Sequence, residues 1–467
     1  MQGTSNLAVA SFETTNPILP SCAGRVFRRT SVPASNLLSR ILTGVAGSAN
    51  GRASVYSIVT HGSTMSAQSW ATDEAPLSDL SKLKICLITS KHPIRDSRIY
   101  GCFYRGIAGA GAQVTIIGPF TDENDRSGDI RSICLPVRCA ASEETLGSLR
   151  LVLSRLVALS CLFYWCLRLR PDIIQACEPD SWIVAWLAAR LTGRRAVFDV
   201  HEMYPAWLTR KFPRMLRHRG EALLLMVFRW LLRRADAVFH VSAERQEYYS
   251  ASSGSQFVVP SYPSAEIAAL PALNRDQQPT DLVHLGRIVE IECRRMLLAA
   301  LARCQEAKRP VSALIVGQTH EEFATGLLPQ ELAPVAHHLR FEPPVSHDKA
   351  LMIASAARIG IALYDPRGAA RNIVASRKLY EYMALGLPVI GTTVSGINAL
   401  IERHRIGFTI PLDSEQFAIA ILRLLGEPGL LEKCGVASRS AFDHFYNWES
   451  QHASLMRIYQ QLANSSN

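Results

Sequence analysis

The chain has 467 residues, of which 48% are hydrophobic and 19% are charged, enough to bury a large core without disulfides or metals. This profile excludes a disordered, collagen-like, coiled-coil or polytopic membrane protein, and roughly 150 residues per domain predicts two or three domains. Lysine and arginine number 50 against 40 acidic residues, and the net charge of +10 suits phosphates, nucleic acid or an anionic membrane.

The first 80 residues differ in composition from the rest. Up to Thr64 the only acid is Glu13, while arginine, serine and alanine are frequent, as in a transit peptide. The alternative is that the true start is Met65, which would make residues 1–80 either a disordered leader or a mis-assigned extension. No apolar stretch of the kind found in secretory signals is present in this segment.

From Lys82 onward, short apolar runs alternate with stretches of helical periodicity. Strands are predicted at 83–89, 114–117, 173–174, 196–200 and 237–241, and helices at about 97–108, 144–168, 180–192 and 220–235. Asp96 lies where the N-cap of the first helix belongs. Strands separated by helices of this length indicate parallel βαβ units with right-handed crossovers.

A glycine cluster at Gly106, Gly109 and Gly111 superficially resembles a dinucleotide-binding fingerprint. A phosphate-binding G-x-G-x-x-G must follow a strand and open a helix, whereas these glycines end a helix and precede a strand. We therefore expect them to terminate the helix, and an NAD-dependent enzyme is not supported.

The alternation pauses near Pro260, Pro263, Pro271 and Pro279, which predicts an interdomain linker. It restarts at 281–285, with further strands expected near 311–316, 359–363 and 387–391. The predicted fold class is α/β, with two Rossmann-like doubly wound domains at 81–265 and 266–445 and a C-terminal helix at 446–467. Such sheets bind ligands beyond the carboxyl ends of their strands, so we expect the ligand site in the cleft between the two domains.

The 11 cysteines are an odd number and no pair has C-x-x-C spacing. The closest pairs, Cys134 with Cys139 and Cys161 with Cys166, have no histidine cluster nearby. We expect neither a disulfide framework nor a zinc site, and a reducing cytoplasm is the favoured compartment.

Four segments together resemble one known family. They are His92–Tyr100 (HPIRDSRIY), Phe198–Pro205 (FDVHEMYP), Asn372 with Ser376–Ile390 (SRKLYEYMALGLPVI), and Tyr446–Glu449 (YNWE). In this order and spacing they resemble family-4 glycosyltransferases of the GT-B fold, of the bacterial cell-envelope polysaccharide type. The resemblance runs from about residue 82 to the end of the chain.

The resemblance implies a nucleotide-sugar donor and no separate cofactor or metal. Lys378 would help to bind phosphate, and Glu381 would accept hydrogen bonds from the ribose diol, for which two carboxylate oxygens are suited. Arg287 would contact the diphosphate, which gains negative charge as the glycosyl bond breaks. Asn372 belongs to the same predicted donor site. The alternative for Lys378 and Glu381 is an exposed i,i+3 ion pair.

The chain also departs from the family pattern. Glu292 stands where the family usually has a lysine, although Arg294 or Arg295 could supply that charge. Gln175 and Cys177 lie where histidines are common, and Ile373 replaces a glutamate. These departures leave open whether the chain is fully active.

On the acceptor side, His201 and Glu202 follow a predicted strand and join Lys378 and Glu381 as candidate catalytic residues. Asp96 and Arg98 are candidate acceptor-side residues, or only an N-cap and its neighbour. The implied activity is transfer of a hexose-like sugar to a glycan or lipid-linked acceptor, with retention of configuration. The alternative is a non-catalytic GT-B protein that binds a nucleotide-sugar or a partner enzyme.

Two apolar runs, at 156–167 and 222–228, are flanked by arginines. Each run by itself is too short to span a bilayer, so the two are predicted either to lie on an anionic membrane surface or to be ordinary packed helices. Peripheral association with the inner face of the plasma membrane is therefore a hypothesis. A nucleic-acid partner is not expected, because no basic motif interleaved with aromatic residues is present.

Overall fold

The computed structural model describes residues 80–120, 130–138, 149–210, 212–249, 255–270, 280–367 and 376–464. The predicted leader, through residue 79, and linker residues 271–279 lie outside the described residues, and so do Asn372 and Ile373.

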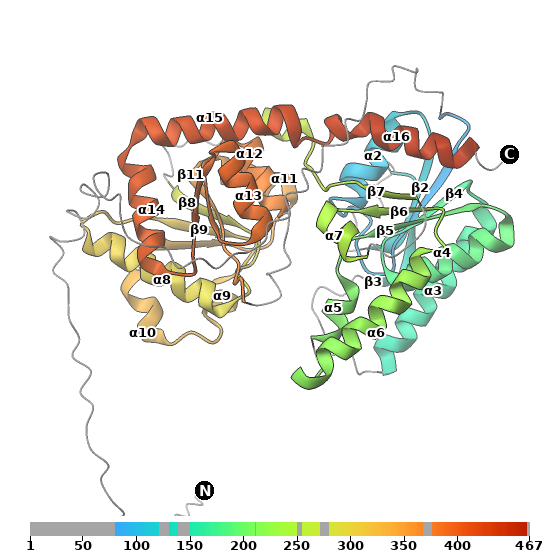
Figure 1. Ribbon diagram of the computed structural model, residues 1–467, viewed down its shortest axis with the longest axis horizontal. Helices are drawn as coiled ribbons and strands as arrows, with labels where there is room; N and C mark the ends of the chain where they lie inside the picture. The colour runs from blue at the N-terminus through green and yellow to red at the C-terminus, as the bar shows by residue number, and fades with distance from the viewer. Residues whose placement is uncertain are drawn as a thin grey trace, which may run out of the picture. The chain divides into compact units, whose positions relative to one another are not determined.

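The first domain contains a seven-stranded parallel sheet with the strand order β3-β2-β1-β4-β5-β6-β7. Its strands are β1 (Lys84–Ile88), β2 (Gln113–Phe120), β3 (Ser132–Arg138), β4 (Ile173–Ala176), β5 (Arg195–Val200), β6 (Ala237–His240) and β7 (Ser255–Val258). Apolar side chains of α3 (Leu149–Leu169), α4 (Pro179–Thr192) and α6 (Arg214–Leu232) pack into one core with this sheet. Short helices α5 (Tyr204–Thr209) and α7 (Ala243–Tyr248) complete its connections (Figure 1).

The second domain contains a six-stranded parallel sheet with the order β10-β9-β8-β11-β12-β13. Its strands are β8 (Thr280–Leu285), β9 (Ala313–Val316), β10 (Leu339–Glu342), β11 (Ala357–Ala362), β12 (Val389–Thr392) and β13 (Gly407–Ile410). Its main helices are α8 (Ile291–Glu306), α9 (His320–Ala324), α10 (Pro329–Leu332), α11 (His347–Ser355), α12 (Arg377–Ala384), α13 (Ser395–His404), α14 (Ser414–Gly426) and α15 (Pro428–Phe445). The predicted α/β fold with two Rossmann-like domains is confirmed.

Four strands were not predicted from the sequence, namely β3, β7, β10 and β13. They are the two edge strands of each sheet. An edge strand is covered less completely than a central one, and β7, β10 and β13 are accordingly only partly buried along most of their length. Their sequences therefore lack the continuous apolar run by which the central strands were recognised.

The helix predicted at 97–108 is a π-helical turn, Ile99–Tyr104, continued by α2 (Arg105–Gly109). Asp96 caps it, because its Oδ1 accepts hydrogen bonds from the backbone N–H of Arg98 and Ile99 at 2.8 and 3.1 Å. Gly111 ends it with a φ of +93°, a left-handed conformation that favours glycine.

The first glycine of this cluster has a different role from the one predicted. A Cβ at Gly106 would lie 3.1 Å from Nε1 of Trp448, so glycine here permits close approach of the chain just before α16 (Glu449–Asn464). Nε2 of His452, on α16, lies 2.9 Å from the carbonyl oxygen of Gly106. The C-terminal helix thus packs on the first domain, beside α2 (Figure 1).

A buried hydrogen bond links α16 to the first sheet. The hydroxyl of Tyr459 donates to Oε1 of Gln175 on β4, and both side chains are fully buried. Gln175, which stands where the family often has a histidine, therefore serves to hold α16.

Replacing Tyr459 with phenylalanine is expected to lower the free energy of unfolding by about 1–2 kcal/mol, because Oε1 of Gln175 would stay buried without this donor. Urea denaturation followed by circular dichroism measures the change. Tyr164→Phe is the matched control, because the ring of Tyr164 is exposed on α3. Equal destabilisation of the two variants would contradict this role of Tyr459.

Candidate active site

Glu381 lies in α12 with its side chain only 8% exposed. Its Oε1 accepts hydrogen bonds from Nε of Arg377 at 2.9 Å and from Nε2 of His347 at 2.7 Å. Burial alone would raise the pKa of Glu381, but the hydrogen bond from His347 and the charge of Arg377 hold it below its usual value. Within the described part of the chain, Oε2 accepts no hydrogen bond. The carboxylate is therefore ionised, and its Oε1 is fixed in orientation.

Lys378 lies one turn before Glu381 but has different partners. Its Nζ is 3.3 Å from Nε2 of His284, near the end of β8, and 4.9 Å from the ring centroid of Tyr364. Nδ1 of His284 is 3.0 Å from the carbonyl oxygen of Gly286, which can only accept, so Nδ1 carries the proton and Nε2 accepts from Lys378. The exposed Lys378–Glu381 ion pair considered as an alternative does not form.

His284 was not recognised as a site residue from the sequence, although a histidine in a buried strand is the kind of signal that could have identified it. Burial, and then the charge of Lys378, lower the pKa of His284 well below its usual value. The ring is therefore neutral and orients the ammonium group of Lys378 at the carboxyl end of the sheet.

Arg287 occupies the loop that follows β8, and its side chain is exposed. The loop begins at Gly286, whose φ is +78°, and packs against Gly317 after β9, whose φ is +98°. A Cβ on Gly317 would lie 3.4 Å from Cα of Gly286, so the two loops approach closely at the carboxyl ends of adjacent strands. This is the edge at which such sheets bind ligands, and Arg287 remains a candidate for the donor diphosphate.

Arg294 is placed differently from the prediction. Its buried side chain extends from α8 to the end of α9, where Nη1 donates to the carbonyl oxygens of Phe323 and, at 2.7 Å, Thr325. These bonds terminate α9, so the placement favours a structural role over contact with the donor. Glu292, in the first turn of α8, forms an ion pair with Arg295 at 3.3 Å.

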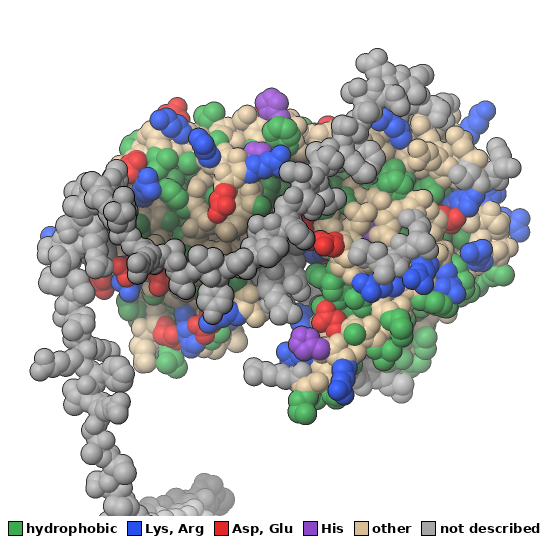
Figure 2. Space-filling model, in the orientation of Figure 1, with side chains coloured by type: hydrophobic (Ala, Val, Ile, Leu, Met, Phe, Trp, Pro, Cys, Tyr) green, Lys and Arg blue, Asp and Glu red, His purple; other side chains and the backbone are tan. Residues whose placement is uncertain are grey.

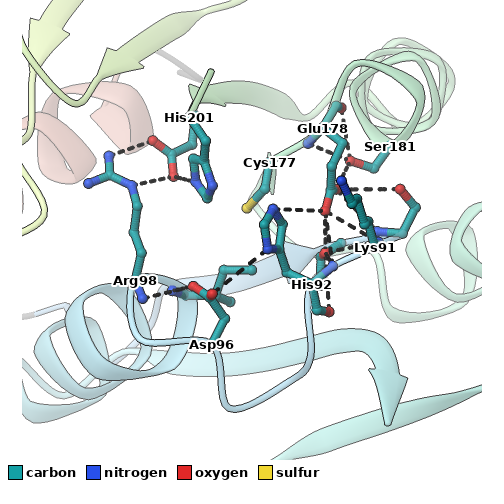
Figure 3. Close-up of polar contacts among 12 residues, drawn as sticks. Lys91, His92, Asp96, Arg98, Cys177, Glu178, Ser181 and His201 are labelled. Carbon is teal, nitrogen blue, oxygen red and sulfur yellow. Dashed lines mark hydrogen bonds and ion pairs between the residues drawn. The ribbon is translucent and has the colours of Figure 1, made fainter. Parts of the chain in front are cut away.

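In the first domain, Arg98, Asp199 and His201 form a chain of polar contacts (Figure 3). Nε and Nη2 of Arg98 donate to the two carboxylate oxygens of Asp199 at 2.9 and 2.6 Å, and Nε2 of His201 lies 2.6 Å from Oδ2. Nη1 of Arg98 donates to the carbonyl oxygen of Val259 at 2.8 Å. Arg98 therefore positions Asp199, and Asp199 in turn positions His201.

Asp199 is fully buried within β5. Burial opposes its ionisation, but the charges of Arg98 and His201 dominate and hold the pKa of Asp199 far below its usual value. The sequence signal that could have identified it is an aspartate inside an otherwise apolar strand, Ala196–Val200.

A second carboxylate, Glu178, lies at the N-terminus of α4 and is also buried. It accepts hydrogen bonds from Oγ1 of Thr89 at 2.5 Å and Oγ of Ser181 at 2.8 Å. Nε2 of His92 lies 3.9 Å from its Oε1, and Nδ1 of His92 lies 3.8 Å from Asp96 (Figure 3). The ring centroids of His92 and His201 are 5.4 Å apart, so His92 lies between Glu178 and His201.

His201 and Glu202 are adjacent in sequence but differ in environment. The side chain of His201 is 11% exposed, whereas that of Glu202 is 61% exposed and lies 3.8 Å from Nη2 of Arg245. This difference favours His201 over Glu202 as a residue that contacts a ligand.

A pocket brings several of the predicted residues together. It is lined by Asp96, Ser97, Arg98, His201, Val241, Arg245, Ser261, Arg377 and Tyr380. The acceptor-side candidates thus share one pocket with Arg377, the partner of Glu381. Lys378, Glu381 and Arg287 do not line this pocket.

Cys177, Asp199 and His201 offer ligand atoms that lie within 4.8 Å of one another, a spacing that could hold a metal ion. The chemistry of the set does not fit one. Both oxygens of Asp199 already accept from Arg98, and burial raises the pKa of the Cys177 thiol well above its usual value, which opposes the thiolate that a metal needs.

Comparison with known proteins links this geometry to a family. Residues 103–261 match the family model described as "Glycosyl transferase 4-like domain", and residues 279–427 match "Glycosyl transferases group 1". The first matched segment contains every strand of the first sheet except β1, and the second contains all six strands of the second sheet.

The chain is 30% identical over 171 residues to a phosphatidyl-myo-inositol mannosyltransferase of Mycolicibacterium smegmatis, a match that spans 36% of this chain and 41% of that relative. Among solved structures it resembles a sucrose-phosphate synthase of Thermosynechococcus elongatus, with a TM-score of 0.62, 20% identity and coverage of 82% of this chain and 100% of that one. It also resembles HepE of Anabaena in complex with UDP-glucose, with a TM-score of 0.59, 16% identity and coverage of 82% and 99%. The two domain matches and the shared architecture show that the chain belongs to the glycosyltransferases of the GT-B fold.

Proposed function

We propose that the protein transfers a sugar from a nucleotide-sugar donor to a glycan or a lipid-linked acceptor, with retention of configuration. The observation that carries the proposal is the ionised Glu381, whose Oε1 is held by Arg377 and His347 while Oε2 accepts no hydrogen bond from the described residues. A ribose diol offers two adjacent hydroxyl donors, for which a fixed carboxylate is a suitable acceptor.

Lys378 and Arg287 would neutralise the diphosphate. Its negative charge grows as the glycosyl bond breaks, so cations close to it stabilise the transition state more than the ground state. His284 contributes indirectly, because it accepts from Lys378 and restricts where the ammonium group can lie. Asn372 belongs to the same donor site by family resemblance.

On the acceptor side, His201 is the residue best placed to contact a sugar hydroxyl. Because its Nε2 donates to Asp199, Nδ1 remains as the second polar atom of the ring. Asp96 lines the same pocket, with Oδ1 used in capping. Arg98 would act as a positioning residue rather than as a direct ligand of the acceptor.

The relatives support the substrate classes. HepE was crystallised with UDP-glucose, in line with a nucleotide-sugar donor, and the relative from Mycolicibacterium acts, by its name, on a phosphatidyl-inositol lipid. A lipid-linked acceptor would place the enzyme in the cytoplasm at the inner face of the plasma membrane, in synthesis of a cell-envelope polysaccharide.

A second candidate is a non-catalytic protein that binds a nucleotide-sugar or a partner enzyme. It is favoured by Glu292, which puts a negative charge in the first turn of α8, where the family usually has a lysine. This charge would repel a diphosphate, although its ion pair with Arg295 weakens the effect.

A thermal-shift screen against UDP-, GDP-, ADP- and TDP-sugars tests the proposal. We expect one nucleotide class to raise the melting temperature of the wild type, and we expect Glu381→Ala to abolish the shift. Transfer or hydrolysis of the stabilising donor then separates an enzyme from a binder. No shift with any donor would contradict the proposed donor site.

A further inference from the structure

The outer side of the helical layer formed by α3, α4 and α6 is unusually apolar. On α6, Phe228 and Leu232 pack into the core, whereas Leu223, Met226 and Trp230 are exposed along one stripe. Arg219 and Arg233 stand at the two ends of this stripe and are also exposed. A helix that only covers a sheet would present mainly polar residues on this side.

The same pattern occurs on α3. Its buried stripe is Ala158, Leu162 and Cys166, and its exposed stripe carries Val157 and Tyr164 before ending at Arg168. Only 17% of the window Val152–Leu169 is buried. On α4, Ile183, Leu187 and Leu191 are likewise exposed, beside Arg190. We call these three exposed stripes the outer helical face.

Charge on the outer helical face is almost entirely positive. The three helices contain two acidic residues, Asp180 and Glu221, and both have partners. Asp180 pairs with Arg155 at 2.5 Å, and Glu221 accepts from the hydroxyl of Tyr248 at 2.8 Å. In Figure 2, hydrophobic and basic side chains mix on the part of the surface that carries α3 and α6.

We propose that the outer helical face docks on the surface of an anionic lipid bilayer. Apolar side chains on three helices would enter the boundary between headgroups and acyl chains, and the arginines at the ends of the stripes would meet lipid phosphates. Charge complementarity favours anionic lipid over a protein partner or a second copy of this chain. The exposed charges of this face are positive, and its two acidic residues already have partners, so a second copy of the face would repel it. Membrane binding is a property of this face and does not depend on sugar transfer.

The structure argues for docking rather than spanning. By length and composition, Val152–Leu169 could cross a membrane. This apolar window is longer than the run at 156–167 that was identified from the sequence. However, α3 joins β3 and β4, two strands of the same parallel sheet. A spanning α3 would place these strands on opposite sides of the bilayer, which one hydrogen-bonded sheet does not allow.

Sedimentation of the full chain with vesicles tests the proposal, without any sugar donor. Vesicles of phosphatidylcholine alone are compared with vesicles of phosphatidylcholine and phosphatidylglycerol. We expect strong binding only to the anionic vesicles, and weaker binding when NaCl is raised from about 0.05 to about 0.5 M. The triple variant Leu223→Ser/Met226→Ser/Trp230→Ser should bind at least about tenfold more weakly.

A second variant, Arg168→Glu/Arg219→Glu, separates the charge contribution and should also lower binding to anionic vesicles about tenfold or more. The matched control is Leu328→Ser/Val436→Ser, which removes exposed apolar side chains from the second domain and should bind like the wild type. All variants alter exposed side chains, and unchanged melting temperatures would show that they fold.

Three results would overturn the proposal. One is no sedimentation with either vesicle, and another is equal binding by the wild type and both outer-face variants. The third is that light scattering finds a dimer of the wild type and a monomer of the triple variant, with no lipid binding by either. That result would assign the face to a second copy of the chain.

Discussion

Glu381→Gln is expected to weaken donor binding about 100-fold and to lower kcat/KM by a similar factor. The glutamine amide must turn its oxygen toward Arg377 and His347, because both of these side chains donate to Oε1. Its NH2 group then takes the place of Oε2 and cannot accept hydrogen bonds from the ribose hydroxyls. The variant therefore loses the charge-assisted acceptor contact that Oε2 of the carboxylate would make with the ribose.

The measurement is calorimetric titration with the donor identified by the thermal-shift screen, followed by initial rates. Glu402→Gln is the control, because Glu402 is exposed on α13 and should leave affinity unchanged. Circular dichroism of the free variant separates loss of binding from loss of fold. A folded Glu381→Gln protein with wild-type affinity for the donor would contradict the proposed role of Glu381.

The central strands of both sheets could be predicted because each is recognisable from its own sequence. Central strands of a parallel sheet are covered on both faces and must be apolar throughout, so Leu83–Thr89 and Ala196–Val200 are recognisable without any partner. The four edge strands lack this constraint and were missed. The described part of α3, Leu149–Leu169, extends beyond the apolar run at 156–167, and residues 144–148 of the predicted helix lie outside the described residues.

The candidate site could be predicted where a local motif marks its residues. Lys378 and Glu381 share α12, and a local motif was enough to select them. Their partners His284 and His347 come from other elements, 94 and 34 residues away from them in sequence, and no local pattern connects these positions. Arg294 is the opposite case, a residue that local sequence selected as a donor-site candidate. Its positive charge suits a diphosphate, but its position on α8 directs its side chain to the end of α9.

The Arg98–Asp199 pair was missed for the same reason, because 101 residues separate its members. Arg98 was selected as an acceptor-side residue by resemblance, and the structure adds the partner that accounts for its burial. A buried arginine needs a counter-charge and acceptors for its remaining N–H groups, and Asp199, Val259 and Ser261 provide them.

Asp199→Asn is expected to lower the free energy of unfolding by about 3–5 kcal/mol, the largest stability loss among the changes considered. The asparagine leaves the guanidinium of Arg98 buried without a counter-charge and also withdraws the anion that orients His201. Urea denaturation measures the loss. The exposed ion pair of Arg439 and Asp443 on α15, at 2.9 Å, provides the control, since Asp443→Asn should cost less than about 1 kcal/mol.

The dependence of this loss on pH identifies its cause. Because the folded-state pKa of Asp199 lies far below the value of about 4 for an unfolded aspartate, its stabilisation is complete above that value and declines as pH falls toward the folded pKa. The difference between wild type and Asp199→Asn should therefore be constant near neutral pH and shrink below about pH 4. In the double variant Arg98→Met/Asp199→Asn no unpaired charge remains, so it should be more stable than Asp199→Asn alone. If the double variant is instead less stable by the sum of the two single losses, the two side chains act independently and the buried ion pair does not explain the effect.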